Sequence, residues 1–334
     1  MRIVIIGAGA IGGYIGARLA RQGADVVLHA RGPHLAAMQT RGLRVRSADG
    51  DFDVRPQVTG DLAAIGPADV IFLGVKAHHV PGIAPQIRPL LAPDTVVVST
   101  QNGIPWWYFQ RHGGELEGLR LERVDPGGAI AESIEAERVI GSLAYFSTEI
   151  VEPGVIHHIE GNRISFGELD GSRSDRCRRI AEALIAAGFR CPISTRFRHE
   201  IWVKLLGNVA FNPISALTGA TLAEMVRHPE VSQVVRAVMA ETEAVAARLG
   251  VELPISIDQR MAGAEKVGEH KTSMLQDLEA GRPMELEAVA GAVIELGERL
   301  GVPMPATTAV YACTKLLDER RSLRPAATAV GAGR

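Results

Sequence analysis

The chain has 334 residues, of which 46% are hydrophobic, so it can form two ordinary domains more readily than one large core. Its formal net charge of -2 is near neutral, which argues against general binding to nucleic acid or to an anionic membrane. Three scattered cysteines without a C-x-x-C pair favour a reducing cytoplasm over a disulfide framework or a zinc site. We expect a cytoplasmic protein, because the chain starts on a strand, which leaves no room for a signal peptide, and no apolar run is long enough to span a membrane.

The first predicted elements form a nucleotide-binding βαβ unit. An apolar strand over residues 1–6 runs directly into a G-x-G-x-x-G pattern, and a helix over 14–21 and a second strand over 25–30 follow. Glycines in this pattern permit a tight turn and let the backbone approach a pyrophosphate, which then lies at the N-terminus of the helix. The residues expected to line this site are Gly7, Ala8, Gly9, Ala10, Ile11 and Gly12.

The end of the second strand indicates which dinucleotide binds. An NAD site places an acidic residue about 20 residues past the glycines for the ribose 2′-hydroxyl, whereas an NADP site has an arginine there. The residue in that window is Arg31, while the nearby acid, Asp25, lies at the wrong end of the strand. Because a guanidinium can bind a 2′-phosphate with two hydrogen bonds, the sequence predicts NADP.

Two further apolar strands, over residues 70–75 and 95–99, are typical of a parallel sheet buried on both faces. Lys76 follows the first, and Gln101-Asn102-Gly103 follows the second. Ligands of such sheets bind beyond the carboxyl ends of the strands, so Lys76 and Asn102 are candidate site residues. Strands over 140–146, 155–158 and 163–167 and a helix over 176–188 complete the first half.

From about residue 195 onward the pattern predicts helices only. Helical periodicity extends over residues 198–210, 231–249, 257–267, 285–300 and 307–320, with glycines and prolines at the breaks. We therefore predict an α/β Rossmann-type N-terminal domain over residues 1–193, followed by an all-α C-terminal domain over 194–321. Residues 322–334 are small and polar, and we expect them to form a flexible tail.

The first helix of the second half carries an unusual polar stripe. Lys204, Asn208 and Asn212 are spaced at i, i+4 and i+8, so a helix places them on one face among apolar neighbours. Burying a lysine and two amides is costly unless partners satisfy them. Two explanations stay open from spacing alone, a structural hydrogen-bond network and a bound polar ligand.

These features together resemble the ketopantoate reductase family, whose members use NADPH to reduce the 2-oxo acid 2-dehydropantoate on the route to pantothenate. The resemblance covers nearly the whole chain and is carried by the βαβ unit, the Gln101-Asn102-Gly103 turn, the polar helix ending in Pro213 and the Thr272–Asp277 segment TSMLQD. It implies that Gly7, Gly9 and Gly12 hold the pyrophosphate, with Arg31 and Lys76 near the adenosine phosphate. It further implies that Asn102 lies between cofactor and substrate, that Asn208, Asn212 and Ser273 hold substrate, and that Lys204 donates the proton. Glu285 matches the active-site glutamate of the family, with a catalytic role and a contact to the cofactor.

The chemistry agrees with these roles. Hydride arriving at a 2-oxo carbon turns the carbonyl oxygen into an alkoxide, which must be protonated or paired with a cation. An ammonium with a reference pKa of about 10.4 can do both, and a carboxylate such as Glu285 can orient it. Each assignment has an alternative, since Glu285 can be a solvated glutamate at a helix start and Ser273 an ordinary turn or cap residue.

The chain departs from the family most clearly after Asn102. Where relatives are polar or acidic, this chain reads Ile104-Pro105-Trp106-Trp107-Tyr108-Phe109. The two tryptophans either reshape the substrate pocket or its lid, or they pack under a loop or at a homodimer interface. The sequence thus predicts an NADPH-dependent reductase of a small 2-oxo acid, foremost 2-dehydropantoate, with a different 2-oxo acid as the alternative. A non-catalytic NADPH sensor is disfavoured, because a sensor requires neither Lys204 nor Glu285.

Overall fold

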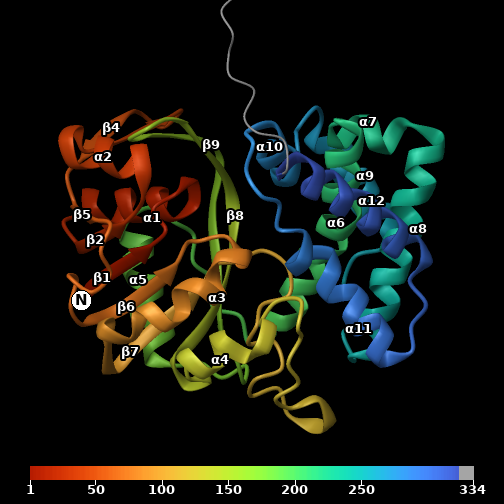
Figure 1. Ribbon diagram of the computed structural model, residues 1–334, viewed down its shortest axis with the longest axis horizontal. Coiled ribbons are helices and arrows are strands. Elements are labelled where there is room, and N and C mark those ends of the chain that lie inside the picture. Colours follow the sequence, from red (N-terminus) through yellow and green to blue (C-terminus); the bar gives the residue numbers. More distant parts are fainter. Residues whose placement is uncertain (323–334) are drawn as a thin grey trace, which may run out of the picture. The chain divides into compact units, whose positions relative to one another are not determined.

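The computed structural model describes residues 1–322, which form two compact units (Figure 1). The first unit comprises Met1–Arg198 and is built on one sheet, and the second begins at His199 and is all helical. This is the predicted fold class, a Rossmann-type α/β unit followed by an all-α unit. Apart from Ser322, the predicted flexible tail lies outside the described residues. Within residues 1–322, every helix is too short or too polar to cross a membrane.

A nine-stranded sheet in the order β4-β3-β9-β8-β7-β6-β1-β2-β5 forms the first unit. The strands are β1 (Arg2–Ile6), β2 (Asp25–His29), β3 (Leu43–Ser47), β4 (Phe52–Val54), β5 (Gln57–Thr59), β6 (Ala68–Leu73), β7 (Leu91–Ser99), β8 (Val139–Glu152) and β9 (Val155–Glu168). From β5 to β8 all neighbours run parallel, whereas β9 turns back antiparallel on β8. The carboxyl ends of β2, β1, β6 and β7 therefore meet at one edge of the sheet, as the candidate ligand site requires.

Helices and short helical turns connect these strands, and one helix follows the last of them. They are α1 (Ala10–Arg21), α2 (Gly32–Arg41), η1 (Ala77–His79), α3 (Val80–Ile83), η2 (Ala84–Leu90), η3 (Gly114–Leu116), η4 (Pro126–Gly128), α4 (Ala129–Ser133), η5 (Ala136–Arg138) and α5 (Asp175–Ala186). Helix α1 packs close to the sheet because of Gly16, where a Cβ would lie 2.4 Å from a methyl of Leu28. This close packing fixes the N-terminus of α1 beside the end of β1.

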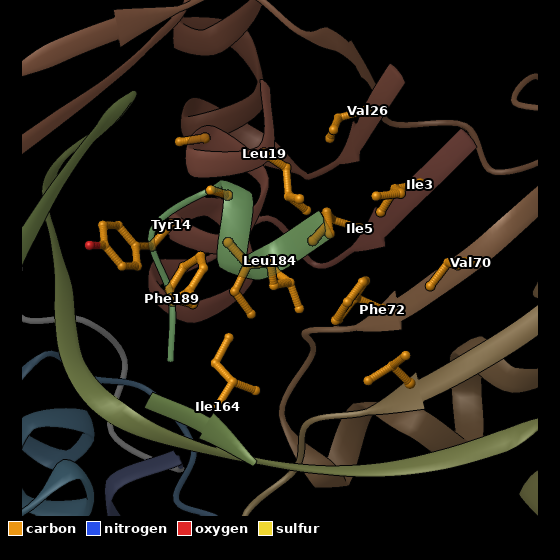
Figure 2. Close-up of a cluster of buried hydrophobic side chains, with 14 of the residues drawn as sticks. Ile3, Ile5, Tyr14, Leu19, Val26, Val70, Phe72, Ile164, Leu184 and Phe189 are labelled. Atoms are coloured by element: carbon orange, nitrogen blue, oxygen red, sulfur yellow. The ribbon is translucent and has the colours of Figure 1, made fainter. Parts of the chain in front are cut away.

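The central strands are buried on both faces, as their continuous apolar runs predict. Ile3 and Ile5 alternate with Val4 and Ile6 along β1, and all four are at most 2% exposed. Figure 2 shows the face on which Ile3 and Ile5 gather with side chains of α1 and α5. Burial of apolar surface at about 25 cal/mol per Å² is the main force that holds this layer together.

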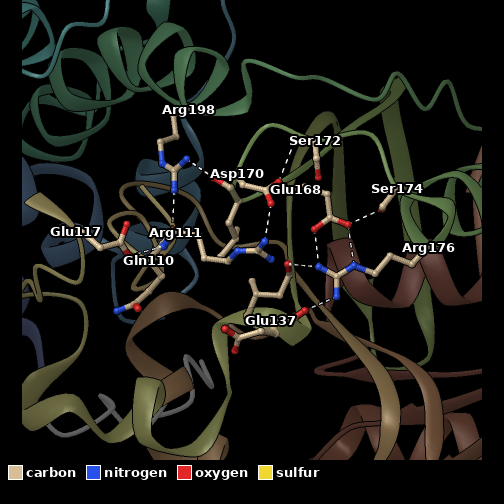
Figure 3. Close-up of polar contacts among 12 residues, drawn as sticks. Gln110, Arg111, Glu117, Glu137, Glu168, Asp170, Ser172, Ser174, Arg176 and Arg198 are labelled. Carbon is tan, nitrogen blue, oxygen red and sulfur yellow. Dashed lines mark hydrogen bonds and ion pairs between the residues drawn. The ribbon is translucent and has the colours of Figure 1, made fainter. Parts of the chain in front are cut away.

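The boundary between the units falls at Arg198 and His199, five residues beyond the position expected from the sequence. Arg198 lies within the first unit because its guanidinium donates hydrogen bonds to the carbonyls of Tyr108 and Gln110, at 2.8 Å each, and to that of Leu169 (Figure 3). Burial removes water from around the Arg198 guanidinium and thereby lowers its pKa. The three carbonyls take the place of that water around its charge. No sequence pattern marks this contact, since backbone carbonyls are its partners.

A second polar cluster in Figure 3 ties α5 to the sheet. Glu168, at the end of β9, is buried and accepts hydrogen bonds from Arg176 at 2.7 and 2.5 Å and from the Ser174 hydroxyl at 2.5 Å. A two-pronged pair of this kind satisfies the buried carboxylate. Ser174 also caps α5 by accepting from the backbone N–H of Cys177.

The tryptophan segment is part of the core of the first unit. Trp106 and Trp107 are 6% and 2% exposed, and the Trp107 ring lies 6.1 Å from that of Phe197. Gly141 makes room for both rings, because a Cβ there would lie 2.5 Å from Phe197 and 2.7 Å from Trp107. Both tryptophan side chains are therefore packed within the subunit, and neither forms an exposed patch for a homodimer interface.

The second unit consists of helices throughout its described length. They are α6 (Phe197–Thr218, whose first two residues belong to the first unit), α7 (Leu222–Arg227), α8 (Pro229–Arg248), α9 (Ile257–Val267), α10 (Ser273–Glu279), the π-helical turn η6 (Glu287–Gly291), α11 (Ala292–Leu300) and α12 (Pro305–Ser322). The predicted range of α9 matches, and α8 and α12 differ from prediction by two residues or fewer at each end. Helix α6 is longer than predicted because it continues through Pro213, past the expected end at 210.

Candidate active site

The glycine loop between β1 and α1 needs glycine at two positions. Gly7 has a φ of 90°, and a Cβ there would lie 2.5 Å from Val75, while a Cβ on Gly12 would lie 2.4 Å from the Gly7 carbonyl oxygen. At Gly9, which precedes α1, a Cβ would meet no described atom within 4 Å. Gly7 and Gly12 permit the turn, and the space beside Gly9 suits a pyrophosphate at the N-terminus of α1. The loop therefore fits a dinucleotide.

The other residues of the loop present backbone rather than functional side chains. Ala8 is buried, whereas Ala10 and Ile11 at the start of α1 are partly exposed. The first turn of α1 holds no acidic residue. A negative ligand therefore meets the positive end of the helix without repulsion from a carboxylate in that turn.

Arg31 lies directly after β2 and is the residue that precedes α2. Its side chain is exposed, and Asp25 is exposed at the opposite end of the strand. Asp61 also lies near this end of β2, since its charge acts on the pKa of His29, but its carboxylate accepts a hydrogen bond from the Ala63 N–H at 2.9 Å. Arg31 is thus an exposed basic residue at the carboxyl end of β2, and its contact with a 2′-phosphate stays a prediction.

Gln101 joins the loops that follow β6 and β7. Its amide donates to the carbonyls of Leu73 and Val75, at 2.7 and 3.0 Å, and accepts from the Ser99 hydroxyl at 3.0 Å. These bonds set the positions of the adjoining Lys76 and Asn102, both of which are partly buried. Gln101 and Gly74, where a Cβ would lie 2.7 Å from the Gly7 carbonyl oxygen, are positioning residues that the sequence analysis missed.

Helix α6 places the three polar residues of its stripe on one face, as predicted. Lys204 and Asn208 are partly buried, and Asn212 is only 7% exposed. The neighbouring positions Leu205, Leu206, Val209 and Ala210 are all buried. The other faces of α6 are thus packed in the core of the unit, and the burial of Lys204 itself makes its charged form costly.

Lys204 and Glu285 act on each other electrostatically. Burial lowers the pKa of Lys204 to about 8, and the negative charge of Glu285 opposes this shift. Glu285 lies at the start of the helical run that contains η6, but it is only 8% exposed, so it is not a solvated glutamate. π-Helical turns frequently occur at functional sites. The second unit thus pairs an ammonium of lowered pKa with a buried carboxylate, a combination typical of proton transfer.

Ser273 is the first residue of α10 and is exposed. The cap of this helix is Thr272, whose hydroxyl accepts a hydrogen bond from the Leu275 N–H at 3.2 Å. The alternative that Ser273 is the capping residue is therefore wrong. Its hydroxyl is available to a ligand.

Comparison with known proteins places these features in a family. The profile described as "Ketopantoate reductase PanE/ApbA" matches residues 3–171, and "Ketopantoate reductase PanE/ApbA C terminal" matches residues 196–318. The chain belongs to the ketopantoate reductase family. The division between the two matches falls in the same part of the chain as the division between the two units.

Individual ketopantoate reductases are similar over almost their whole length. A 2-dehydropantoate 2-reductase of Mesorhizobium japonicum is 49% identical over 96% of this chain and 99% of its own. A crystal structure from Ralstonia solanacearum MolK2 has a TM-score of 0.92 at 41% identity, covering 97% of this chain and 99% of its own. The 2-dehydropantoate 2-reductase structure from Methylococcus capsulatus has a TM-score of 0.80 at 33% identity, with the same coverage.

Proposed function

We propose that the protein is an NADPH-dependent 2-dehydropantoate 2-reductase, which reduces the 2-oxo group of its substrate to a hydroxyl. The observation that carries this function is the pairing of Lys204, on the polar face of α6, with the buried Glu285, in a chain that also has a dinucleotide-binding glycine loop. The similarity to a 2-dehydropantoate 2-reductase over nearly the full length of both chains supports the choice of substrate.

Residues of both units have roles in this function. The glycine loop, Arg31 and Lys76 would hold NADPH, which supplies the hydride when bound. Lys204 donates a proton to the oxygen of the substrate carbonyl as negative charge develops there, and the Glu285 carboxylate keeps Lys204 protonated. Asn102, Asn208, Asn212 and Ser273 would hold the remaining polar groups of the substrate.

A panel assay tests this function. NADPH oxidation is followed with 2-dehydropantoate and with a set of other small 2-oxo acids at matched concentrations. We expect the largest kcat/KM for 2-dehydropantoate. A higher value for another acid would assign the protein to that substrate, and tight NADPH binding without turnover of any acid would make it a sensor.

Arg31 predicts the choice of cofactor. We expect kcat/KM to be higher with NADPH than with NADH, and Arg31→Asp to reverse this order, because a carboxylate repels the 2′-phosphate and accepts from the 2′-hydroxyl. Arg44→Asp is a matched control, since Arg44 is an exposed arginine of the same unit that pairs with Asp53 at 2.9 Å. Equal efficiency with both cofactors in the unmodified protein would contradict the assignment of Arg31.

The proposal also covers the cellular compartment and the oligomeric state of the protein. All three cysteines are free, and burial raises the pKa of Cys177 to about 11 and that of Cys191 to about 12, so these two thiols are unreactive. Free thiols suit the reducing cytoplasm in which we place the enzyme. We also propose that the protein forms a homodimer, which sedimentation of the purified protein tests.

A further inference from the structure

An arginine of the second unit lies against the helix that carries Lys204. Arg260, on α9, extends its guanidinium over Gly207 of α6, where a Cβ would lie 2.1 Å from Nη2 and 2.6 Å from Cζ. The Arg260 Cζ also lies 5.9 Å from the centre of the Phe211 ring. Glycine at 207 is therefore what allows this guanidinium to contact the α6 backbone.

The charge of Arg260 has no anionic partner within residues 1–322. Its Nε is buried and has no hydrogen-bond partner there. Burial lowers its pKa, and no acidic side chain contributes to that shift. Other partly buried arginines of the chain have partners, such as Glu168 for Arg176 and three carbonyls for Arg198. An unpaired, largely desolvated guanidinium is costly, which makes Arg260 an exception that a bound anion would explain.

The position of Arg260 relative to the α6 stripe points to the substrate as that anion. Gly207 and Phe211 follow Lys204 by three and seven residues, so they lie on the same side of the helix as Lys204. The guanidinium thus lies against the flank of α6 that adjoins the polar stripe on its Lys204 side. A 2-oxo acid bound at this face would have its carbonyl oxygen and its carboxylate only one carbon apart.

We propose that Arg260 binds the carboxylate of the 2-oxo acid substrate. This inference rests on the proposed function and adds the group that selects acids over neutral carbonyl compounds. A guanidinium is suited to the task, because its planar N–H groups match the two oxygens of a carboxylate. Lys204 is then left to act on the carbonyl oxygen, with the two cations serving different parts of the substrate.

The test compares an acid with its neutral counterpart. The kcat/KM for 2-dehydropantoate is measured beside that for the corresponding 2-oxo amide, in the wild-type protein and in Arg260→Leu. We expect the variant to lose about 10- to 100-fold on the acid and little on the amide, since a hydrogen bond to a charged group is what has been removed. The Kd for NADPH and the melting temperature are measured on the same preparations.

Two further variants separate charge recognition from packing. Gly207→Ala keeps the arginine but forces its guanidinium away from α6, so we expect the same selective loss on the acid, smaller in size. Arg236→Leu is the matched control, because Arg236 is an exposed arginine of the same unit that already pairs with Asp258 of α9 at 2.6 Å. It should leave the acid-to-amide ratio unchanged.

Three results would overturn the inference. Equal losses on acid and amide in Arg260→Leu would make Arg260 a packing residue, and a weakened Kd for NADPH with an unchanged acid-to-amide ratio would assign it to a phosphate of the cofactor. Failure of the proposed function is a separate outcome: the wild-type protein would then reduce a different 2-oxo acid, on which the same comparison decides the role of Arg260. Turnover of no 2-oxo acid at all would overturn both.

Discussion

Lys204→Ala should lower kcat by about 100- to 10,000-fold, the range typical of a lost general acid. The Kd for NADPH should change little, because the glycine loop that fits the dinucleotide belongs to the other unit. Lys204→Arg should restore little activity, since a guanidinium keeps the charge but is a much weaker acid with a different shape. Steady-state kinetics and cofactor titration on one preparation make the comparison.

The stability of a Lys204 variant separates catalysis from packing. Lys204→Met keeps the apolar stem of the side chain and removes the charge. A pKa of about 8 for Lys204, lowered by burial, means that its protonated form destabilises the folded protein at neutral pH by roughly 3 kcal/mol. We therefore expect Lys204→Met to melt no lower than the wild type while losing kcat. A variant that melts lower yet retains near-normal kcat would end the catalytic assignment.

The second large effect concerns pH. With Lys204 as the proton donor, kcat/KM should be constant at neutral pH and fall about tenfold per unit above the pKa of about 8, as the ammonium loses its proton. The charge of Glu285 raises the pKa of Lys204 against the effect of burial. In Glu285→Gln that support is gone, so the pKa of Lys204 falls and the decline begins at lower pH. The loss relative to wild type should be larger at pH 8 than at pH 6.

Glu287→Gln is the control for this pH profile. Glu287 is two residues further along the chain, and its carboxylate accepts from Tyr311 at 2.7 Å and pairs with Lys315 at 3.5 Å. Its removal should leave the alkaline limb where it is in the wild type. An alkaline limb that stays in place in Glu285→Gln as well would mean that Glu285 does not support the charge of Lys204.

Local patterns in the sequence determined much of this protein. The G-x-G-x-x-G run predicts the β1–α1 turn because two of its glycines meet backbone or side-chain atoms where no Cβ fits. Continuous apolar runs predict the parallel strands, and the i, i+4, i+8 spacing predicts the Lys204 face of α6. Each of these depends on residues close together in the chain.

Long-range pairing decided the parts of the fold that the sequence analysis missed. The short strands β3, β4 and β5 lie towards the edges of the sheet and gain their order from pairing with distant partners, such as β3 with β9. The hairpin of β8 and β9 is longer than predicted, because shifts in its register interrupt the alternation on which the prediction depends. Helices α7 and α10 are too short for periodicity to reveal, although Thr221 and Thr272 cap them.

For the candidate active site, too, the sequence predicted some features and only the tertiary structure decided others. Residue type and spacing identified Lys204 and Arg31 as candidates, and the resemblance to the ketopantoate reductases added Glu285. Only the tertiary structure decided that Glu285 is buried where its charge acts on Lys204, and that Arg260 reaches over Gly207, 53 residues earlier in the chain. The pKa of a lysine and the pairing of an arginine depend on which groups surround them, and distant segments supply those groups only when the chain has folded.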